Sequence, residues 1–276
     1  MAERRERKAN MGVVSQVEQL TPHMVRVVLG GDSLAGLPAD QFTDHYIKIL
    51  FPQPGVTYPE PFDVGAIRAG MPPETWPVIR TYTVRRWSPE VPELWVDFVI
   101  HGDVGVAGPW ALRAKPGDQV FFMGPGGGYA PSAEADWHLL AGDESALPAI
   151  AAALEGMPAG ARVTAFIEVI DPAEVQKLET PAAADIIWLY RGDERPGSAL
   201  VPAVRSFEFP DGQMQAFVHG EANFVKDLRR YLRVERGIPL SQLSISGYWR
   251  NGLNEDGWQS SKREWNAQIE AEQDQP

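Results

Sequence analysis

The sequence predicts a two-domain protein of the β + α/β class, with an N-terminal antiparallel six-stranded β-barrel and a C-terminal parallel sheet covered by helices. Two observations predict this class. Residues 12–123 contain six short runs in which apolar and polar residues alternate between turns rich in Gly, Pro and Asp. From residue 137 onward, apolar runs alternate with helical patterns, which is typical of βα units. Gly and Pro accumulate between the halves, in residues 124–136.

The first half is expected to supply the strands of the barrel. Its six runs are VVSQVEQ, MVRVVLG, HYIKILF, RTYTVRR, LWVDFVIH and QVFFMGP. The proline-rich segment 52–77 is expected to be a surface loop. Residues 1–10 are charged and lack an apolar stretch, so they predict a frayed tail and not a secretory signal. We therefore expect a barrel over residues 11–132.

The second half alternates expected strands with expected helices. An α/β domain is expected over 133–250 and a helical tail over 251–276. The expected strands are WHLLAGD, RVTAFIEVI, DIIWLYRG, MQAFVHG and LSISGYW. The expected helices are SALPAIAAALEGM, DPAEVQKLE, SALVPAVRSF, EANFVKDLRRYLRVERG and GWQSSKREWNAQIEAEQ.

Composition excludes several classes of function. The chain of 276 residues carries a formal net charge of −12, which disfavours nucleic acid and anionic membranes as partners. It contains no cysteine, which excludes thiol chemistry, disulfides and a protein-bound iron–sulfur cluster. No apolar run reaches the roughly 20 residues of a membrane helix. The five histidines have no metal-binding spacing, so no dedicated metal site is expected.

The run RTYTVRR, residues 80–86, is unusually polar for a half-buried strand. On a strand, Arg80 and Tyr82 point to one side, and Thr81 and Thr83 to the other. One interpretation is an exposed strand with its arginines in water. The other is a strand that holds a planar, charged ligand, with the tyrosine ring against it and an arginine on its phosphate.

A glycine-rich loop, residues 102–108, follows the run VDFVIH and leads into a short helix expected to begin at Pro109. Unpaired N–H groups and the helix dipole make such a loop suited to an anion such as a pyrophosphate. A plain loop with a proline-initiated turn explains the same residues.

Three later strand ends carry polar or aromatic residues. Asp143 and Ser145 follow the first parallel strand, where either side chain would cap a helix or meet a nucleotide. Glu221 begins another helix, a position that the helix dipole favours in any case. Tyr248 and Trp249 end the last strand, where they cover a cofactor or close an interface.

Taken together and in order, these stretches resemble the siderophore-interacting protein family, a branch of the ferredoxin-reductase-like flavoproteins. The matching stretches are RTYTVRR, DFVIHGDVGVAGPWA, AGDESALPAI, VHGEANFVKDLRRYL and SGYWRNG, within about residues 40–250. The resemblance implies an FAD-binding barrel followed by a Rossmann-like, NAD(P)H-binding domain.

The resemblance also implies site residues. Those implied to bind FAD are Arg80, Thr81, Tyr82, Thr83, Asp97, Val99, His101, Gly105, Ala107, Gly108, Trp110, Ala111, Asp143 and Ser145. Those implied to bind NAD(P)H are Asp143, Glu144, Ser145 and Glu221, and those implied to bind substrate are Lys48 and Arg250. Ordinary surface charge would also explain the last two. The family's further arginine is missing from GPGGG, residues 124–128, which argues against a full basic triad.

The implied activity is reduction of a ferric siderophore in the cytoplasm, with flavin-mediated electron transfer and no catalytic side chain. NADH, NADPH and a ferredoxin stay open as electron donors, although Glu168 or Asp171 after the second parallel strand would hydrogen-bond a ribose 2′-hydroxyl and favour NADH. A flavin reductase of another acceptor and a siderophore-binding module without turnover are the alternatives. A hydrolase lacks a visible nucleophile and base.

Overall fold

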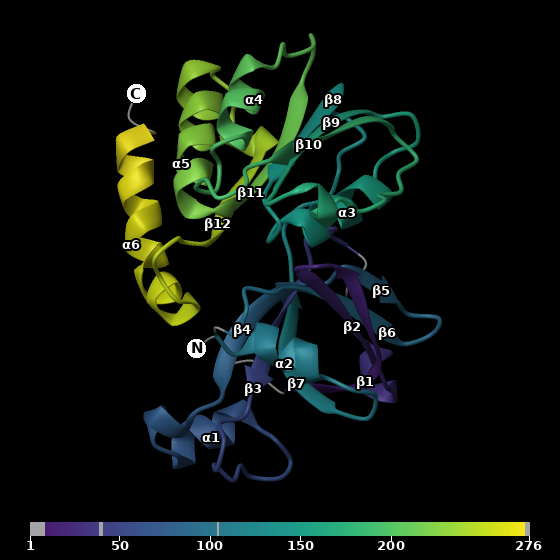
Figure 1. Cartoon of the computed structure of the whole chain (residues 1–276), viewed down its shortest axis with the longest axis vertical. Coiled ribbons are helices and arrows are strands. Elements are labelled where there is room, and N and C mark those ends of the chain that lie inside the picture. Colours follow the sequence, from purple (N-terminus) through teal and green to yellow (C-terminus); the bar gives the residue numbers. More distant parts are fainter. Residues whose placement is uncertain (1–8, 39–40, 104, 274–276) are drawn as a thin grey trace, which may run out of the picture. The chain divides into compact units, whose positions relative to one another are not determined.

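The computed structural model describes residues 9–38, 41–103 and 105–273 (Figure 1). The chain divides into two compact units, Met1–Gly127 and Gly128–Pro276. Almost all of the expected tail over residues 1–10 lies outside the described residues, and β1 begins at Asn10.

The N-terminal unit contains one antiparallel sheet of seven strands in the order β4-β3-β7-β1-β2-β6-β5. The predicted class is confirmed, but the expected number of six strands is wrong, because the run RTYTVRR divides into β4 and a short β5. The strands are β1 Asn10–Thr21, β2 Met24–Gly30, β3 Tyr46–Phe51, β4 Val78–Thr83, β5 Arg86–Ser88, β6 Glu93–Val99 and β7 Gln119–Gly126.

The two edge strands of this sheet, β4 and β5, are consecutive in the chain. Only Val84 and Arg85 separate them, and two residues span at most about 7 Å. The Val84 N–H donates to the His45 carbonyl beside β3, and the Arg85 N–H donates to the Trp95 carbonyl of β6, at 2.6 and 2.8 Å. The two edges therefore meet, and the sheet closes into a barrel around an apolar core.

Two helices accompany the barrel. The expected surface loop over 52–77 contains α1, Val64–Gly70, which buries Val64 and Ile67 and is capped by the Asp63 carboxylate. Helix α2 runs over Ala107–Arg113, so it begins two residues before the expected Pro109. Proline is tolerated there because the first N–H groups of a helix have no intrahelical acceptor.

The C-terminal unit contains a parallel sheet of five strands in the order β10-β9-β8-β11-β12. Its strands are β8 Trp137–Gly142, β9 Arg162–Val169, β10 Ala183–Tyr190, β11 Met214–Glu221 and β12 Leu243–Trp249. Its helices are α3 Leu147–Glu155, α4 Leu200–Ser206, α5 Ala222–Arg230 and α6 Glu255–Gln273.

Strand order determines which face each helix covers. The crossover through α3 moves from β8 toward one edge, and the crossovers through α4 and α5 move the opposite way. Right-handed crossovers in opposite directions place helices on opposite faces, so α4 and α5 share the face that α3 does not cover (Figure 1). The chain order reverses between β8 and β11, which makes this point of the carboxyl edge the switch point where ligands bind in such sheets.

One expected helix is absent, and another changes its helix type within the expected range. The segment DPAEVQKLE forms only a 3-10 turn, Pro172–Glu174, and Val175 stays exposed, because the segment presents no apolar face to the sheet. Helix α5 continues as a π-helical turn over Tyr231–Glu235. Helix α6 lies alongside α5, where Lys226 pairs with Glu272 at 2.8 Å.

Candidate functional site

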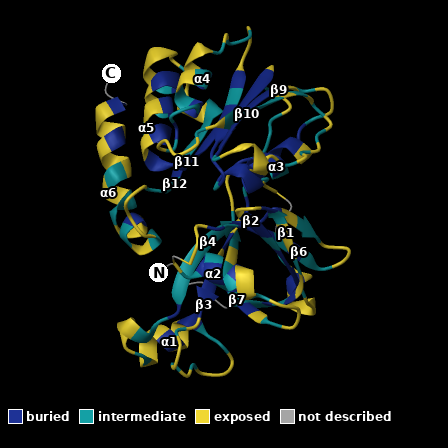
Figure 2. Ribbon diagram, viewed as in Figure 1, coloured by how far each residue is buried: buried dark blue, intermediate teal, exposed yellow. Residues whose placement is uncertain are grey.

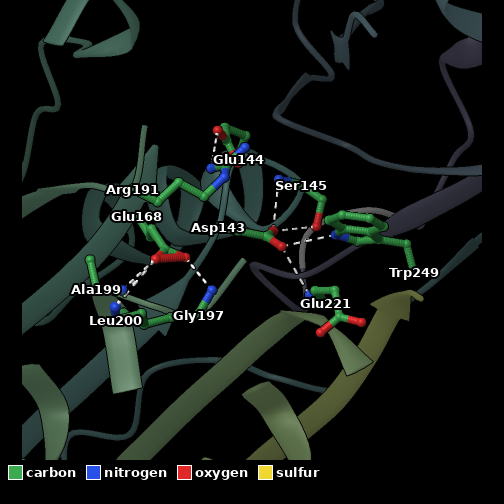
Figure 3. Close-up of polar contacts among 10 residues, drawn as sticks. All are labelled: Asp143, Glu144, Ser145, Glu168, Arg191, Gly197, Ala199, Leu200, Glu221 and Trp249. Atoms are coloured by element: carbon green, nitrogen blue, oxygen red, sulfur yellow. Dashed lines mark hydrogen bonds and ion pairs between the residues drawn. The ribbon is translucent and has the colours of Figure 1, made fainter. Parts of the chain in front are cut away.

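Every strand of the parallel sheet brings a polar side chain to the carboxyl edge (Figure 3). Asp143 follows β8, Glu168 lies near the end of β9, Arg191 follows β10, Glu221 ends β11 and Trp249 ends β12. Carboxyl ends of parallel strands meet at one edge of a sheet, so residues spread over more than 100 positions form a single group. The sequence pattern identified Asp143, Glu221 and Trp249 here, and missed Arg191.

Asp143 is 1% exposed, and its carboxylate accepts four hydrogen bonds. Oδ1 accepts from the N–H and hydroxyl of Ser145 at 3.0 and 2.5 Å. Oδ2 accepts from the Glu221 N–H at 2.9 Å and from the Trp249 indole Nε1 at 2.8 Å (Figure 3). The side chain thus joins three strand ends, and its lone pairs are occupied within the protein.

The turn around Asp143 leaves no room for a larger neighbour. Gly220 has φ +139°, and a Cβ there would lie 2.7 Å from Asp143 Oδ1. A Cβ on Gly142 would lie 2.6 Å from the Ala146 Cβ. The two glycines are required so that the ends of β8 and β11 approach each other at the switch point.

Glu221 is also 1% exposed and fully hydrogen-bonded. Oε2 accepts from the N–H groups of Asn223 and Phe224 at 2.7 and 3.3 Å, which caps the start of α5. Oε1 accepts from the Asn223 amide at 2.9 Å and from the Asn251 N–H at 3.1 Å. Glu221 therefore begins α5, as expected, and its carboxylate also holds the segment that follows β12.

Glu168 is completely buried and cannot meet a ribose. Its carboxylate accepts from the N–H groups of Gly197, Ala199 and Leu200, the last two at 2.9 and 3.3 Å, at the start of α4 (Figure 3). The expectation that Glu168 reads a 2′-hydroxyl is wrong, because β9 points this side chain under α4. Asp171 is exposed and accepts from the Ala173 N–H at 2.7 Å.

Glu144 pairs with Arg191 at 2.5 Å, and both side chains are nearly buried. Burial raises the pKa of the Glu144 carboxyl, and the charge of Asp143 raises it further, while Arg191 opposes both effects. The arginine thus compensates the nearly buried Glu144 carboxylate at the switch point. No sequence motif predicted the role of Arg191, because its partner Glu144 lies 47 residues away in the chain.

A cavity of about 180 Å³ lies between the first turns of α4 and α5 at the same edge. Arg195 and Ser198 line it from the loop before α4, Asn223, Phe224 and Asp227 line it from α5, and Glu221 and Asn251 line it from the ends of β11 and β12. Its position and its mixed apolar and polar lining fit a part of a dinucleotide.

His219 is a buried group that the motifs did not assign. Its ring stacks on Phe217 at 3.9 Å between centroids, and Nε2 lies 3.0 Å from the Ser244 hydroxyl. Burial lowers the pKa of His219 to about 3, with a further contribution from the Lys262 charge. The ring is therefore neutral at physiological pH and serves as an aromatic, hydrogen-bonding part of β11.

In the barrel, strand β4 differs from its neighbours. Residues 78–82 are all half-exposed, whereas Ile47 and Ile49, directly opposite Tyr82 and Arg80 on β3, are 0% and 1% exposed (Figure 2). The Tyr82 ring contacts Phe98 at 4.3 Å between centroids. The half-exposed side chains on the face of Arg80 and Tyr82 are what a flat ligand would cover.

Lys48 lies directly opposite Thr81 on the other face of this strand pair, and its side chain is exposed. A residue expected at the substrate and one expected at FAD are thus neighbours on the barrel. Their common face is open, whereas Thr83 and Arg85 further along are 8% and 9% exposed.

Other expected FAD residues take part in packing. Asp97 is 4% exposed and accepts two hydrogen bonds from Arg26, both at 2.7 Å, while the Arg26 guanidinium lies over the Trp95 ring. Ala107 and Ala111 are buried where α2 contacts the core, and Trp110 lies near Phe51 and Phe98. Val99 and Gly108 are half-buried, and His101 and Gly105 are exposed.

These residues fit an FAD molecule on the barrel. The half-exposed Tyr82 offers an aromatic face, Arg80 is a cation for a phosphate, and Gly105, with φ +85°, leaves open space beside α2. Asp97 is the exception, since its carboxylate is committed to Arg26. Among the described residues, no cluster of His, Asp or Glu could hold a metal ion, and no helix is long and apolar enough to cross a membrane.

Comparisons with known proteins match both units. Residues 13–129 match the family described as siderophore-interacting FAD-binding domain, and residues 135–252 match the family described as siderophore-interacting protein. The chain is 37% identical to the ferric vibriobactin reductase ViuB of Vibrio cholerae, over 88% of this chain and 90% of that protein. It is 31% identical to the NADPH-dependent ferric-chelate reductase of Escherichia coli, over 86% and 91%. The crystal structure of the siderophore-interacting protein SipS from Aeromonas hydrophila superposes with a TM-score of 0.80 at 31% identity, covering 95% of this chain and 99% of that one.

Proposed function

Because the chain belongs to the siderophore-interacting protein family, we propose that it is an FAD-dependent reductase of ferric siderophores that takes its electrons from NAD(P)H. The observation that carries the proposal is the half-exposed β4 row around Tyr82, in the unit that matches an FAD-binding domain family. The names of the reductases from Vibrio and Escherichia support the same reaction. Bound FAD would supply the redox chemistry, since it accepts two electrons from a nicotinamide and gives single electrons to ferric iron.

The barrel residues would hold and orient the flavin. The Tyr82 ring would pack on the isoalloxazine, Thr81 and Thr83 would meet its polar edge, and Arg80 would neutralise a phosphate. The backbone around Gly105 and Gly108 would follow the pyrophosphate. Asp97 would act only through Arg26, which it holds in place.

The parallel sheet would hold the dinucleotide at its switch point. The cavity beside α4 and α5 has the size of a part of such a ligand, and Arg195 would favour a phosphate. Asp143 and Glu221, expected as direct ligands, would instead shape the loops, because their carboxylates are occupied. With Glu168 removed as a ribose ligand, the sequence argument for NADH rests on the exposed Asp171 alone, and NADPH is the donor named for the relative from Escherichia.

The substrate would be an anionic ferric chelate that the acidic chain must attract locally. Lys48 is exposed beside Thr81, and Arg250 follows β12 half-buried. Reduction would release the iron, since a ferrous ion is bound more weakly by the chelator. The compartment that we propose for this reaction is the cytoplasm. A ferredoxin as electron donor is the second candidate.

Anaerobic visible spectroscopy tests the proposal. We expect the purified protein to bind FAD, its flavin bands to bleach with NADPH or NADH, and the bands to return as a ferrous trap reports iron from a ferric siderophore. A protein that takes up no FAD would contradict the proposal. If both nicotinamides leave the flavin oxidised and a reduced ferredoxin bleaches it, the electron donor is a ferredoxin and not NAD(P)H. Cell fractionation tests the compartment.

A further inference from the structure

The segment after β12 is held from both sides of Arg250. On one side, the Trp249 indole donates to Asp143 Oδ2 at 2.8 Å. On the other, the Asn251 N–H donates to Glu221 Oε1 at 3.1 Å. Two consecutive attachments to buried carboxylates therefore bracket a single cationic side chain.

The two carboxylates form one unit. Asp143 Oδ2 accepts the Glu221 N–H at 2.9 Å, so the residue that anchors Trp249 also anchors the residue that holds Asn251. Each carboxylate is 1% exposed and accepts four hydrogen bonds, so neither has room to rearrange. A satisfied buried network of this kind fixes the geometry of the groups attached to it.

The chain turns immediately after these attachments. The Leu253 N–H donates to the Arg250 carbonyl at 3.1 Å, and Gly252 has φ +84°. Among the described residues only glycines have positive φ, so Asn251 and Gly252 are the central residues of a type II turn. The two carboxylates hold the residues on either side of Arg250, next to this turn.

We propose that Asp143 and Glu221 are positioning residues for substrate binding, and that they hold the Trp249 side chain and the Asn251 backbone on either side of Arg250 so that its guanidinium meets an anionic ferric siderophore. This inference rests on the proposed function. It assigns the two buried carboxylates a role in chelate binding, although Glu221 also lines the cavity proposed for the dinucleotide.

The test compares Asn251→Pro with Asn251→Ala. Both variants lose the amide side chain, but only proline loses the N–H that Glu221 accepts. Proline is common at the second position of a type II turn, so the turn is kept. The probe is an anionic ferric tris-catecholate, titrated by quenching of tryptophan fluorescence, and a neutral ferric tris-hydroxamate is the control ligand.

We expect the proline variant to bind the anionic chelate about fivefold more weakly than the alanine variant, the range of a displaced exposed charge contact. The dissociation constant of the neutral chelate should be the same for the two variants. In an Arg250→Ala background, the difference between proline and alanine should vanish. Trp249→Phe, which keeps an aromatic ring but removes the indole N–H, is a second variant and should weaken the anionic chelate in the same selective way.

Equal dissociation constants for the two Asn251 variants would overturn the inference. So would a difference that persists without Arg250, or one that appears in the Michaelis constant for NAD(P)H and not in chelate binding. The proposed function fails separately: wild-type protein that binds the chelate but never reduces it would contradict the reductase, while the comparison of binding would still decide the role of the carboxylates.

Discussion

The two units of this protein differ in the exposure and the hydrogen bonding of their polar side chains. At the edge of the parallel sheet, Asp143, Glu168 and Glu221 are at most 1% exposed and accept between three and four hydrogen bonds each. On barrel strand β4, Arg80 and Tyr82 stay half-exposed on a face that elsewhere is closed (Figure 2). The sheet uses its carboxylates to hold loops, and the barrel keeps its polar strand accessible.

The comparison teaches that a motif gives the identity of a residue but not its task. A carboxylate at a strand end is equally suited to a ribose hydroxyl and to backbone N–H groups. At the carboxyl edge of the parallel sheet the loops approach one another closely. Their backbone N–H groups donate hydrogen bonds to the carboxylates, whose oxygens are then occupied. On β4, Arg80 and Tyr82 stay half-exposed.

The largest effect is expected from Glu168→Gln. An amide cannot accept all three N–H groups at the start of α4, so buried donors lose their partner and the free energy of unfolding should fall by about 4 kcal/mol. Asp171→Asn, at an exposed cap, is the matched control and should cost less than about 1 kcal/mol. Urea denaturation measures both. Equal effects would mean that the buried carboxylate holds nothing that the exposed one does not.

His219 should make the sheet sensitive to acid. Its folded-state pKa is about 3, below the ordinary value of 6.5, so its contribution to stability is complete above pH 6.5 and is lost as the pH falls toward 3. Between pH 6.5 and pH 4 the loss should reach up to about 3 kcal/mol. His219→Gln should flatten the pH dependence measured by urea denaturation. A variant that follows the wild-type curve would show that another group titrates.

Asp97 is a barrel residue whose two carboxylate oxygens already accept hydrogen bonds from Arg26, like the carboxylates of the parallel sheet. It therefore tests whether the difference between the two units holds for every polar residue. Asp97→Asn breaks the paired hydrogen bonds to Arg26 and should lower the free energy of unfolding by about 2 kcal/mol. The FAD dissociation constant of the folded variant, measured by fluorescence titration, should change less than threefold. A tenfold weaker FAD complex with unchanged stability would place Asp97 among the ligands.

The smallest effect is expected at the open strand. Tyr82→Ala removes the aromatic face and should weaken FAD binding about tenfold, or ~1.4 kcal/mol. Tyr82→Phe keeps the ring and should weaken it less. Apoprotein titrated with FAD gives both constants. If the Tyr82→Ala variant binds FAD as tightly as the wild type, the half-exposed β4 row is not the flavin site.

Much of the fold was predictable because its periodicities are strong. All five parallel strands appear where an apolar run precedes a helical pattern, and the barrel strands follow the alternating runs. The errors have local causes. Strand β5 is three residues long and shares a run with β4, and DPAEVQKLE has helix-forming residues but no apolar face to bury.

The site was predictable at the level of strand ends and not at the level of contacts. Asp143, Ser145 and Glu221 were found because they follow strands in recognisable motifs. That Asp143 would meet Trp249, 106 residues away, or that Glu144 would meet Arg191, depends on strand order, which no local pattern contains. The same holds for Glu168, whose partners begin 29 residues later.

The two-residue link between β4 and β5 has a consequence for engineering. A protein circularly permuted between Val84 and Arg85 would carry new ends at the seam of the barrel, and two strand edges with unpaired N–H and C=O groups would face neighbouring molecules. Such a permutant should aggregate. New ends placed in the exposed part of the 52–77 insert, for example at Gly55, would leave β4 and β5 connected and should be tolerated.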